Sequence, residues 1–486
     1  MSTLRTMSVD ATLLAARSGG DWIGDPGAIT ASSVEIDSRA CTEGSVFAAL
    51  PGQNADGHDY LDAAAENGAV AALVEREVDR APLPLLRVSN VQQALNGLGA
   101  AGRDAHAAAG GRLVGITGSV GKTGSKEMLA HLLRAAGDCH ASRASFNNHL
   151  GVPLTLATLP AADVPAVQEI GMNAPGEITV LSALARPDIA IITRIADSHA
   201  GFFNSLDAIA NAKAEIFDGL APGGTAILNR DDAFFDILAA RADKAGAGHL
   251  ITFGTDAASD VRLCDTHRTA DGMTVTAEIA GTRLSFALGM RGAHWAMNAM
   301  AVLAAVSALG LNVSDAAENL SDFRDLPGRG AVTSGYVGSA EITLIDDSYN
   351  AGPAAMTAAF ASLAAAPPQI MVLSDMLELG DGSAAAHAAL APQITALCPR
   401  LLITIGAEMS RMAATLDCAT LHKPADSAAQ AISLLHDHLQ NGDAVFIKGS
   451  NGSGAWRVAA GLAEAMHATP SEDPSERIVG ETTDAA

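Results

Sequence analysis

The chain has 486 residues and a formal net charge of −24, with 49% hydrophobic and 17% charged residues. This balance is typical of a folded protein, and the length indicates about three domains of roughly 100–200 residues each. The negative charge argues against general binding of DNA, RNA or an anionic membrane, because such binding depends mainly on Lys and Arg.

The first part of the chain, residues 1–110, is predicted to be a small mixed α/β domain. Short apolar strands alternate there with loops, and a helical pattern at residues 60–67 ends at Gly68 before a strand at residues 69–74. The Ala- and Gly-rich residues 105–111 mark the end of this domain.

The central part, residues 111–327, alternates strands with helices, which predicts a parallel sheet with crossover helices. Its clearest strands are at residues 113–117, 188–194 and 224–229. Residues 261–290 differ, because period-two segments flank Ala280-Gly281 and an earlier Asp-Gly pair. We expect antiparallel hairpins there, packed against the edge of the central domain.

The third part, residues 328–466, repeats the alternation and is predicted to be a second doubly wound, Rossmann-like domain. Its apolar strands are predicted at residues 342–345, 370–373, 401–405 and 444–447. Residues 467–486 are rich in Ser, Glu, Asp, Thr and Pro, so we expect a disordered tail. The predicted fold class is therefore α/β with three domains.

The cellular compartment is predicted from cysteine usage and from the N-terminus. The five cysteines are far apart without Cys-x-x-Cys spacing, and the first 17 residues lack the apolar core of a secretion signal. The longest apolar stretch, residues 296–311, is too short for a membrane span and is expected to be a buried helix. We expect a cytoplasmic monomer that neither enters a membrane nor binds nucleic acid.

A phosphate-binding loop is predicted where the strand at residues 113–117 meets a helix. The glycines allow backbone N–H groups to surround phosphate oxygens at the positive end of that helix. Lys122 would reach the outer phosphates of ATP and Thr123 would ligate magnesium, although Ile116 replaces the first Gly of the commonest P-loop spelling. The alternative is a glycine turn with a solvated Lys. The predicted loop consists of Thr117, Gly118, Ser119, Val120, Gly121, Lys122 and Thr123.

Several further motifs follow the loop in a fixed order, and together with it they resemble the Mur ligase family. They are Ser-Phe-Asn-Asn-His-Leu-Gly at residues 145–151, Glu-Ile-Gly-Met-Asn-Ala-Pro-Gly-Glu at 169–177, His199, and Ala-Lys-Ala-Glu at 212–215. Residues 37–39, 346–353 and 374–380 look like those members that join D-alanyl-D-alanine to UDP-N-acetylmuramoyl-tripeptide. The resemblance implies an ATP-dependent amide ligase that forms an acyl phosphate, which the dipeptide amine then attacks.

The resemblance also implies a magnesium site, with two ions, beside the ATP. Thr123 and Glu169 supply oxygen ligands and His199 a nitrogen, and Lys213 contributes when carbamylated by carbon dioxide. The catalytic residues implied are Lys122, His199 and Lys213. The plainer interpretations are a solvated Glu169, a packed His199 and a surface Lys213.

Further ligand contacts are implied by the resemblance in all three predicted domains. For ATP they are Asn298 beside the adenine, Arg329 at the γ-phosphate after domain closure, and Asp347 at the ribose, with Asp346 as the alternative. Linker, turn or cap roles would explain several of these residues as well. The substrate-binding residues implied are Ser38 and Arg39 for the uridine diphosphate, Asn147 and Asn148, and Asn350 on the dipeptide side.

Four positions depart from the family pattern. Trp295 replaces an Asn, Gly124 lacks a hydroxyl next to Thr123, and Ser374 and Asn451 replace Gly and Arg in the third domain. The last two bear on the amine substrate. Rival functions are a ligase adding diaminopimelate or lysine, although the Asp-Asn-Pro-Arg motif of the former is not found, a folylpolyglutamate synthetase, or an ATP-hydrolysing switch.

Overall fold

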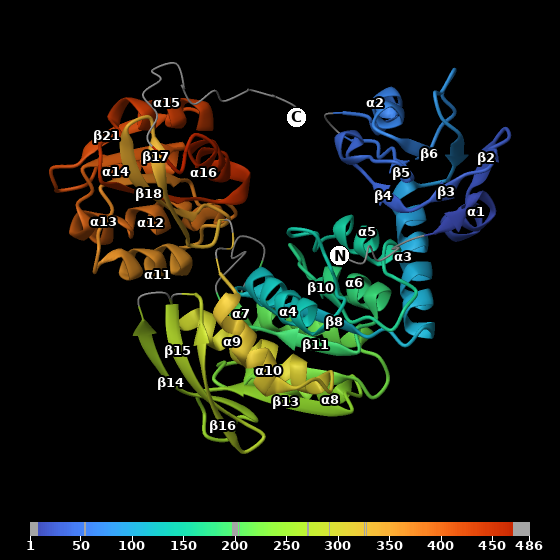
Figure 1. Ribbon diagram of the computed structural model, residues 1–486, viewed down its shortest axis with the longest axis horizontal. Coiled ribbons are helices and arrows are strands. Elements are labelled where there is room, and N and C mark those ends of the chain that lie inside the picture. Colours follow the sequence, from blue (N-terminus) through green and yellow to red (C-terminus); the bar gives the residue numbers. More distant parts are fainter. Residues whose placement is uncertain are drawn as a thin grey trace. The chain divides into compact units, whose positions relative to one another are not determined.

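The computed structural model describes residues 8–52, 55–196, 203, 205–269, 272–290, 292–324, 326 and 328–469. The chain divides into two compact units (Figure 1), of which the first contains residues up to 196 and 205–323, and the second contains residues from 324 onward. Among the described helices, none is both long and apolar enough to cross a membrane. The fold class is α/β, as predicted.

The first sheet of unit 1 has five strands in the order β2-β7-β6-β5-β4, and only β2 is antiparallel to its neighbour. The strand predicted at residues 69–74 is β6, and the helix predicted before it is a 3-10 turn, Gly57–Tyr60, followed by α2. A separate two-stranded sheet pairs β1 with β3. The elements are β1 Val9–Asp10, α1 Ala11–Ser18, β2 Asp21–Ile23, β3 Thr30–Ala31, β4 Ser33–Glu35, β5 Ser45–Ala48, α2 Leu61–Glu66, β6 Ala69–Val74, β7 Leu85–Arg87 and α3 Val91–Ala108.

Helix α3 joins this sheet to the central one by packing closely on α5. A Cβ atom at Gly102 would lie 2.1 Å from the carbonyl oxygen of Leu156, so only glycine permits this approach. Leu154 and Ala157 of α5 are buried in the same apolar cluster as Leu95 of α3. The first two sheets therefore share part of one core.

The central sheet has nine strands in the order β16-β15-β14-β13-β12-β11-β8-β10-β9. Its strands are parallel from β9 to β14, and β14, β15 and β16 are antiparallel, as the hairpin signals predicted. The hairpins do not merely pack at the edge, because β14 pairs with β13 and extends the same sheet. The strands are β8 Leu113–Thr117, β9 His140–Ala141, β10 Ala166–Glu169, β11 Ile189–Ile192, β12 Thr225–Asn229, β13 His249–Gly254, β14 Val261–Thr269, β15 Gly272–Ile279 and β16 Thr282–Leu288.

The helices of the central sheet place the nucleotide loop against a buried helix. The apolar stretch predicted as a helix is α9, which is buried along most of its length. It packs on α4, the helix that opens after the loop (Figure 1). The helices are α4 Lys122–Ala136, α5 Gly151–Ala157, α6 Glu177–Ala185, α7 Leu206–Ala214, α8 Phe235–Lys244, α9 Ala293–Ala308 and α10 Val313–Glu318.

Unit 2 has a six-stranded sheet in the order β17-β18-β22-β19-β20-β21, parallel except for β17. The four predicted strands are confirmed as β18, β19, β20 and β22, and apolar clusters cover both faces. His467, within the predicted tail, exchanges two backbone hydrogen bonds with Tyr336, while residues 470–486 lie outside the described part. The elements are β17 Ala331–Val337, β18 Ala340–Asp347, α11 Pro353–Leu363, β19 Ile370–Ser374, α12 Ser383–Ala388, α13 Ala391–Leu397, β20 Leu401–Ile405, α14 Ala407–Ala413, β21 Leu421–Ala425, α15 Ala428–His438, β22 Asp443–Lys448 and α16 Ala455–Glu464.

Candidate active site

The glycine-rich loop connects β8 to α4, which is the strand–loop–helix context predicted for it. Gly118 and Gly121 have φ angles of +146° and +85°, which side chains other than glycine rarely adopt. Among the residues that the structure describes, no side chain caps the start of α4, so its first N–H groups lie at the loop without a side-chain partner. This geometry suits an anion such as a phosphate group.

Lys122 lies at the first position of α4 and folds back over the loop. Its Nζ donates to the carbonyl oxygens of Gly118 at 2.8 Å and of Ser119 at 3.2 Å. Thr193, just beyond β11, donates from its hydroxyl to the carbonyl oxygen of Val120 at 2.6 Å and thereby holds the middle of the loop. A positive charge is therefore present where the outer phosphates of a nucleotide would lie.

Glu169 ends β10, the strand beside β8, and its carboxylate lies next to the loop. The hydroxyl of Thr123 donates to Oε2 at 2.7 Å, and the amide of Asn147 donates to Oε1 at 2.7 Å. The residue is only 1% exposed. Neither donor is charged, so a buried carboxylate in this position attracts a cation, and its oxygens are the ligands that magnesium prefers.

Lys213, on α7, is fully buried rather than on the surface, and within the described part of the chain its Nζ has no hydrogen-bond partner. Burial, assisted by the charge of Lys122, holds the pKa of this amine well below its usual value, and the charge of Glu169 opposes the shift. An unpaired buried ammonium is costly, so burial favours the neutral, nucleophilic form of this amine.

The remaining predicted residues of this region have different outcomes. Asn298, on α9, lies over the loop, because a Cβ atom at Gly121 would be 2.8 Å from its Oδ1. Asn148 instead accepts hydrogen bonds from the N–H groups of Leu150 and Gly151 at the start of α5. His199 lies outside the described residues.

Two departures from the family pattern are complementary in the structure. A Cβ atom at Gly124 would lie 2.7 Å from Cζ3 and 2.9 Å from Cη2 of Trp295, so the ring occupies the space of the missing side chain. Trp295 is 4% exposed and contacts Phe323 edge-on, with ring centroids 5.9 Å apart. The two replacements therefore depend on each other.

In the first sheet, Ser38 and Arg39 form a single 3-10 turn that Asp37 caps. The guanidinium of Arg39 makes two hydrogen bonds to the Asp37 carboxylate, at 3.0 and 2.8 Å, and thereby holds the pKa of Asp37 below its usual value. Ser38 is buried, whereas the Arg39 side chain is 72% exposed and accessible to an anionic ligand.

In unit 2, Lys448 contacts two of the predicted ligand-binding residues. Its ammonium donates to Asp347 Oδ2 at 2.7 Å and to the carbonyl oxygen of Asn350 at 2.9 Å. Burial raises the pKa of Asp347, although Lys448 opposes the shift. The alternative, Asp346, accepts from backbone and side chain of Ser348 and is engaged in the local turn. Arg329 stacks on the Tyr349 ring, with Cζ 4.1 Å from its centroid.

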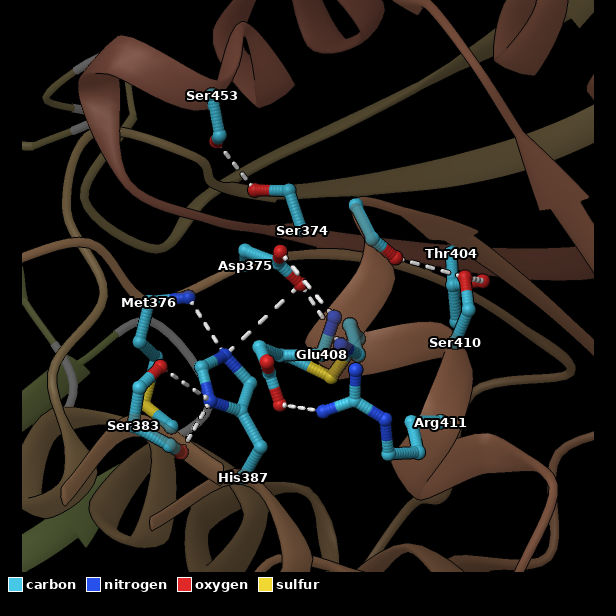
Figure 2. Close-up of polar contacts among 12 residues, drawn as sticks. Ser374, Asp375, Met376, Ser383, His387, Thr404, Glu408, Ser410, Arg411 and Ser453 are labelled. Carbon is cyan, nitrogen blue, oxygen red and sulfur yellow. Dashed lines mark hydrogen bonds and ion pairs between the residues drawn. The ribbon is translucent and has the colours of Figure 1, made fainter. Parts of the chain in front are cut away.

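The segment after β19 is fixed by contacts that the sequence did not predict (Figure 2). The Asp375 carboxylate accepts from the N–H groups of Glu408 and Met409 at the start of α14. The buried ring of His387 accepts from the N–H of Met376 at 2.9 Å. Ser374, the replacement for Gly, contacts the hydroxyl of Ser453 at 2.5 Å. These bonds give residues 374–376 one defined conformation.

A second residue that sequence reasoning missed is Lys126, which lies fully buried on α4. The available signal was its position, three and seven residues before the buried Leu129 and Leu133, on the apolar face of the helix. A charged residue on such a face needs partners inside the protein.

Comparison with known protein families gives three matches along the chain. The Mur ligase family catalytic domain matches residues 30–103, the Mur ligase middle domain residues 116–306, and the Mur ligase glutamate ligase domain residues 332–451. The three matches follow the order of the three large sheets.

Individual relatives agree with these matches. The UDP-N-acetylmuramoyl-tripeptide–D-alanyl-D-alanine ligase of Bacillus subtilis is 35% identical over 353 residues, which is 72% of this chain and 74% of the relative. A crystal structure of MurF from Acinetobacter baumannii has 29% identity and a TM-score of 0.78, covering 95% of this chain and 100% of that one. MurF from Thermotoga maritima in complex with ADP has 25% identity and a TM-score of 0.71, covering 88% and 96%.

Proposed function

This chain belongs to the Mur ligase family, and from that premise we propose that it joins D-alanyl-D-alanine to UDP-N-acetylmuramoyl-tripeptide, using ATP, in peptidoglycan precursor synthesis. The similarity to UDP-N-acetylmuramoyl-tripeptide–D-alanyl-D-alanine ligases supports these substrates. That similarity extends over most of the chain. The observation that best supports the use of ATP is the buried Glu169 carboxylate, hydrogen-bonded to Thr123 of the phosphate loop.

The residues present fit magnesium beside the nucleotide. Thr123 and Glu169 offer oxygen donors, and burial lowers the pKa of the Lys213 amine, which favours the neutral form that attacks the carbon of carbon dioxide. That attack, with loss of one proton from the nitrogen, gives a carbamate anion for a second ion. When bound, magnesium supplies positive charge that offsets the phosphates. We keep His199 as the predicted nitrogen ligand.

The chain's own residues have distinct tasks in this proposal. The start of α4 and Lys122 bind the phosphates, Asn298 lies beside the base, and Asn147 orients Glu169. The tripeptide carboxylate attacks the γ-phosphorus and ADP leaves. The dipeptide amine then attacks the acyl carbon, phosphate leaves, and the amine proton passes to solvent. Ordering of the two anions, rather than a nucleophilic side chain, accelerates the reaction.

Contacts from the other two predicted domains complete the proposal. Ser38 and Arg39 bind the uridine diphosphate, and Arg39 has an exposed guanidinium for it. Arg329 and Asp347 bind the nucleotide and Asn350 the dipeptide side after domain closure. In line with the cysteine usage of the sequence, we propose that the reaction takes place in the cytoplasm.

Product analysis tests this proposal. Purified protein with ATP, magnesium and UDP-N-acetylmuramoyl-tripeptide is mixed separately with D-alanyl-D-alanine, diaminopimelate, lysine or glutamate, and products are weighed by mass spectrometry. Of the four amines, only D-alanyl-D-alanine is expected to give a new amide. Phosphate release is expected only when both UDP-N-acetylmuramoyl-tripeptide and D-alanyl-D-alanine are present. Ligation of one of the other amines, or phosphate release without an acceptor, would assign the chain to another ligase or to a switch.

A further inference from the structure

Lys126 lies one turn after the phosphate loop, on α4, and is 0% exposed. Its ammonium donates to the carbonyl oxygen of Ser142 at 2.8 Å and to that of Ala144 at 2.7 Å, and it contacts the carboxylate of Glu127 at 2.6 Å. The ammonium thus has three oxygen partners, two carbonyl groups and one carboxylate. Two of these acceptors belong to one segment that follows β9.

That segment, residues 142–147, has an uncommon backbone conformation at its centre. Ala144 has a φ of +42°, in the left-handed region that residues with a side chain seldom adopt. Such a conformation persists where surrounding contacts fix it, and Lys126 binds the carbonyl groups of Ser142 and of Ala144 itself. The ammonium therefore holds the segment in its bent form.

The same segment surrounds Glu169. Asn147 donates from its side chain to Glu169 Oε1 and accepts at its backbone oxygen from the N–H of Gly171, at 2.7 and 2.8 Å. Ser142 Oγ accepts from the backbone N–H of Glu169 at 3.4 Å. The position of Glu169 thus depends on both ends of the segment.

The opposite side of the segment is tied to the first sheet. Arg143 donates to both oxygens of Glu35, at 2.8 and 2.9 Å, and Glu35 is 7% exposed at the end of β4. The Arg143 side chain is more than half exposed, in contrast to the fully buried Lys126. Lys126 provides the contact on the nucleotide side.

We propose that Lys126 is a positioning residue for magnesium binding: it holds residues 142–147 so that Asn147 orients the Glu169 carboxylate toward the ion. The inference rests on the proposed function, because magnesium at Glu169 is part of it. Lys126 itself touches neither the ion nor the substrate, and its effect passes through Asn147. Outer partners of metal ligands typically change metal affinity about 10- to 100-fold when they are lost.

The test compares Lys126→Met with Lys244→Met, an exposed lysine at the end of α8 that loses the same charge. Mn²⁺ affinity is measured by electron paramagnetic resonance with a non-hydrolysable ATP analogue present, and amide exchange is measured on protein without metal or nucleotide. In Lys126→Met, Mn²⁺ affinity is expected to fall roughly 10-fold or more. The amides of residues 142–147 and of Gly171 are expected to exchange faster, with metal-free nucleotide affinity unchanged.

A second pair of variants keeps the inference testable if Lys126→Met does not fold. Lys126→Gln retains a donor for one carbonyl and should give an intermediate loss of Mn²⁺ affinity. Asn147→Ala should reproduce the loss of Mn²⁺ affinity seen in Lys126→Met, but without faster amide exchange at Ser142. Unchanged Mn²⁺ affinity in Lys126→Gln, or a uniform rise in exchange over all of unit 1, would overturn the inference and leave a purely structural lysine. Failure of the proposed function can be distinguished from failure of this inference. In that case the unsubstituted protein itself would bind no Mn²⁺ in the presence of the nucleotide.

Discussion

Gly124 and Trp295 are expected to be energetically coupled, because they share one volume beside the nucleotide loop. Gly124→Ala adds a single Cβ atom, which would lie 2.7 and 2.9 Å from two atoms of the indole ring. The ring has little room to move, since it is 4% exposed and contacts both His294 and Phe323. The substitution therefore overpacks the site.

Two terms set the size of the effect. Alanine in place of glycine inside a helix stabilises by about 1 kcal/mol. Overpacking a rigid core costs about 1–3 kcal/mol. With Trp295 present, Gly124→Ala should therefore be neutral or destabilise by up to about 2 kcal/mol. With Trp295→Asn the clash is absent and the same change should stabilise by about 1 kcal/mol. The helix term cancels in the double-mutant cycle, so the coupling energy equals the overpacking cost of about 1–3 kcal/mol.

Native-state amide exchange at the buried positions of α4 gives the local free energies, because it reports on this helix rather than on both units. The control is Gly382→Ala at the start of α12, where a Cβ atom meets nothing within 4 Å. Its effect should be the same with Trp295 or Asn at position 295. A coupling energy under about 0.5 kcal/mol for Gly124 and Trp295 would refute the claim that the two replacements compensate each other.

Three further predictions concern charged residues. Lys122→Ala should lower the ligation rate at least about 100-fold, as loss of one charge-stabilising group does; full turnover in steady-state assays would contradict the phosphate role. Lys213 has a lowered pKa in the folded protein, so the unfolded chain binds more protons and stability should rise with pH up to the unfolded value near 10.5. Lys213→Met should flatten that rise in urea titrations between pH 7 and 9 and abolish ligation, and an unchanged slope would show that the buried amine is not the cause. Arg39→Met should raise KM for the UDP substrate by roughly 10-fold at constant kcat. A fall in kcat with unchanged KM would contradict a substrate-binding role for Arg39.

The sequence predicted those parts of the fold that local pattern determines. The continuous apolar run of β8 and the glycines after it define a buried strand entering a phosphate loop, and both are found. β21, Leu421–Ala425, contains His422, Lys423 and Pro424 and is partly exposed at the sheet edge, so its pattern lacked the apolar signal. Its pairing with β20 is a tertiary property.

The residues of the candidate site also differ in this way: some follow from a local motif, and others depend on tertiary packing. Glu169 and Asn147 were predicted from their motifs, but nothing local relates Lys126 to residues 142–147, because the contact closes only when α4 packs on β10. Gly124 and Trp295 were each visible as a departure from the family pattern. Their complementarity depends on a distance between two helices that sequence spacing does not contain.

Two fully buried lysines in one unit illustrate how partners, and not burial, decide what an ammonium group does. Lys126 and Lys213 are both 0% exposed. Lys126 donates to two backbone carbonyl groups and pairs with the Glu127 carboxylate, so it orders the backbone around Glu169. Lys213 has no such partner among the described residues, and burial lowers its pKa well below the usual value, which favours the neutral amine. A neutral amine cannot hold a loop by charge, but it can react with an electrophile. The first lysine is therefore suited to position a metal ligand and the second to become one.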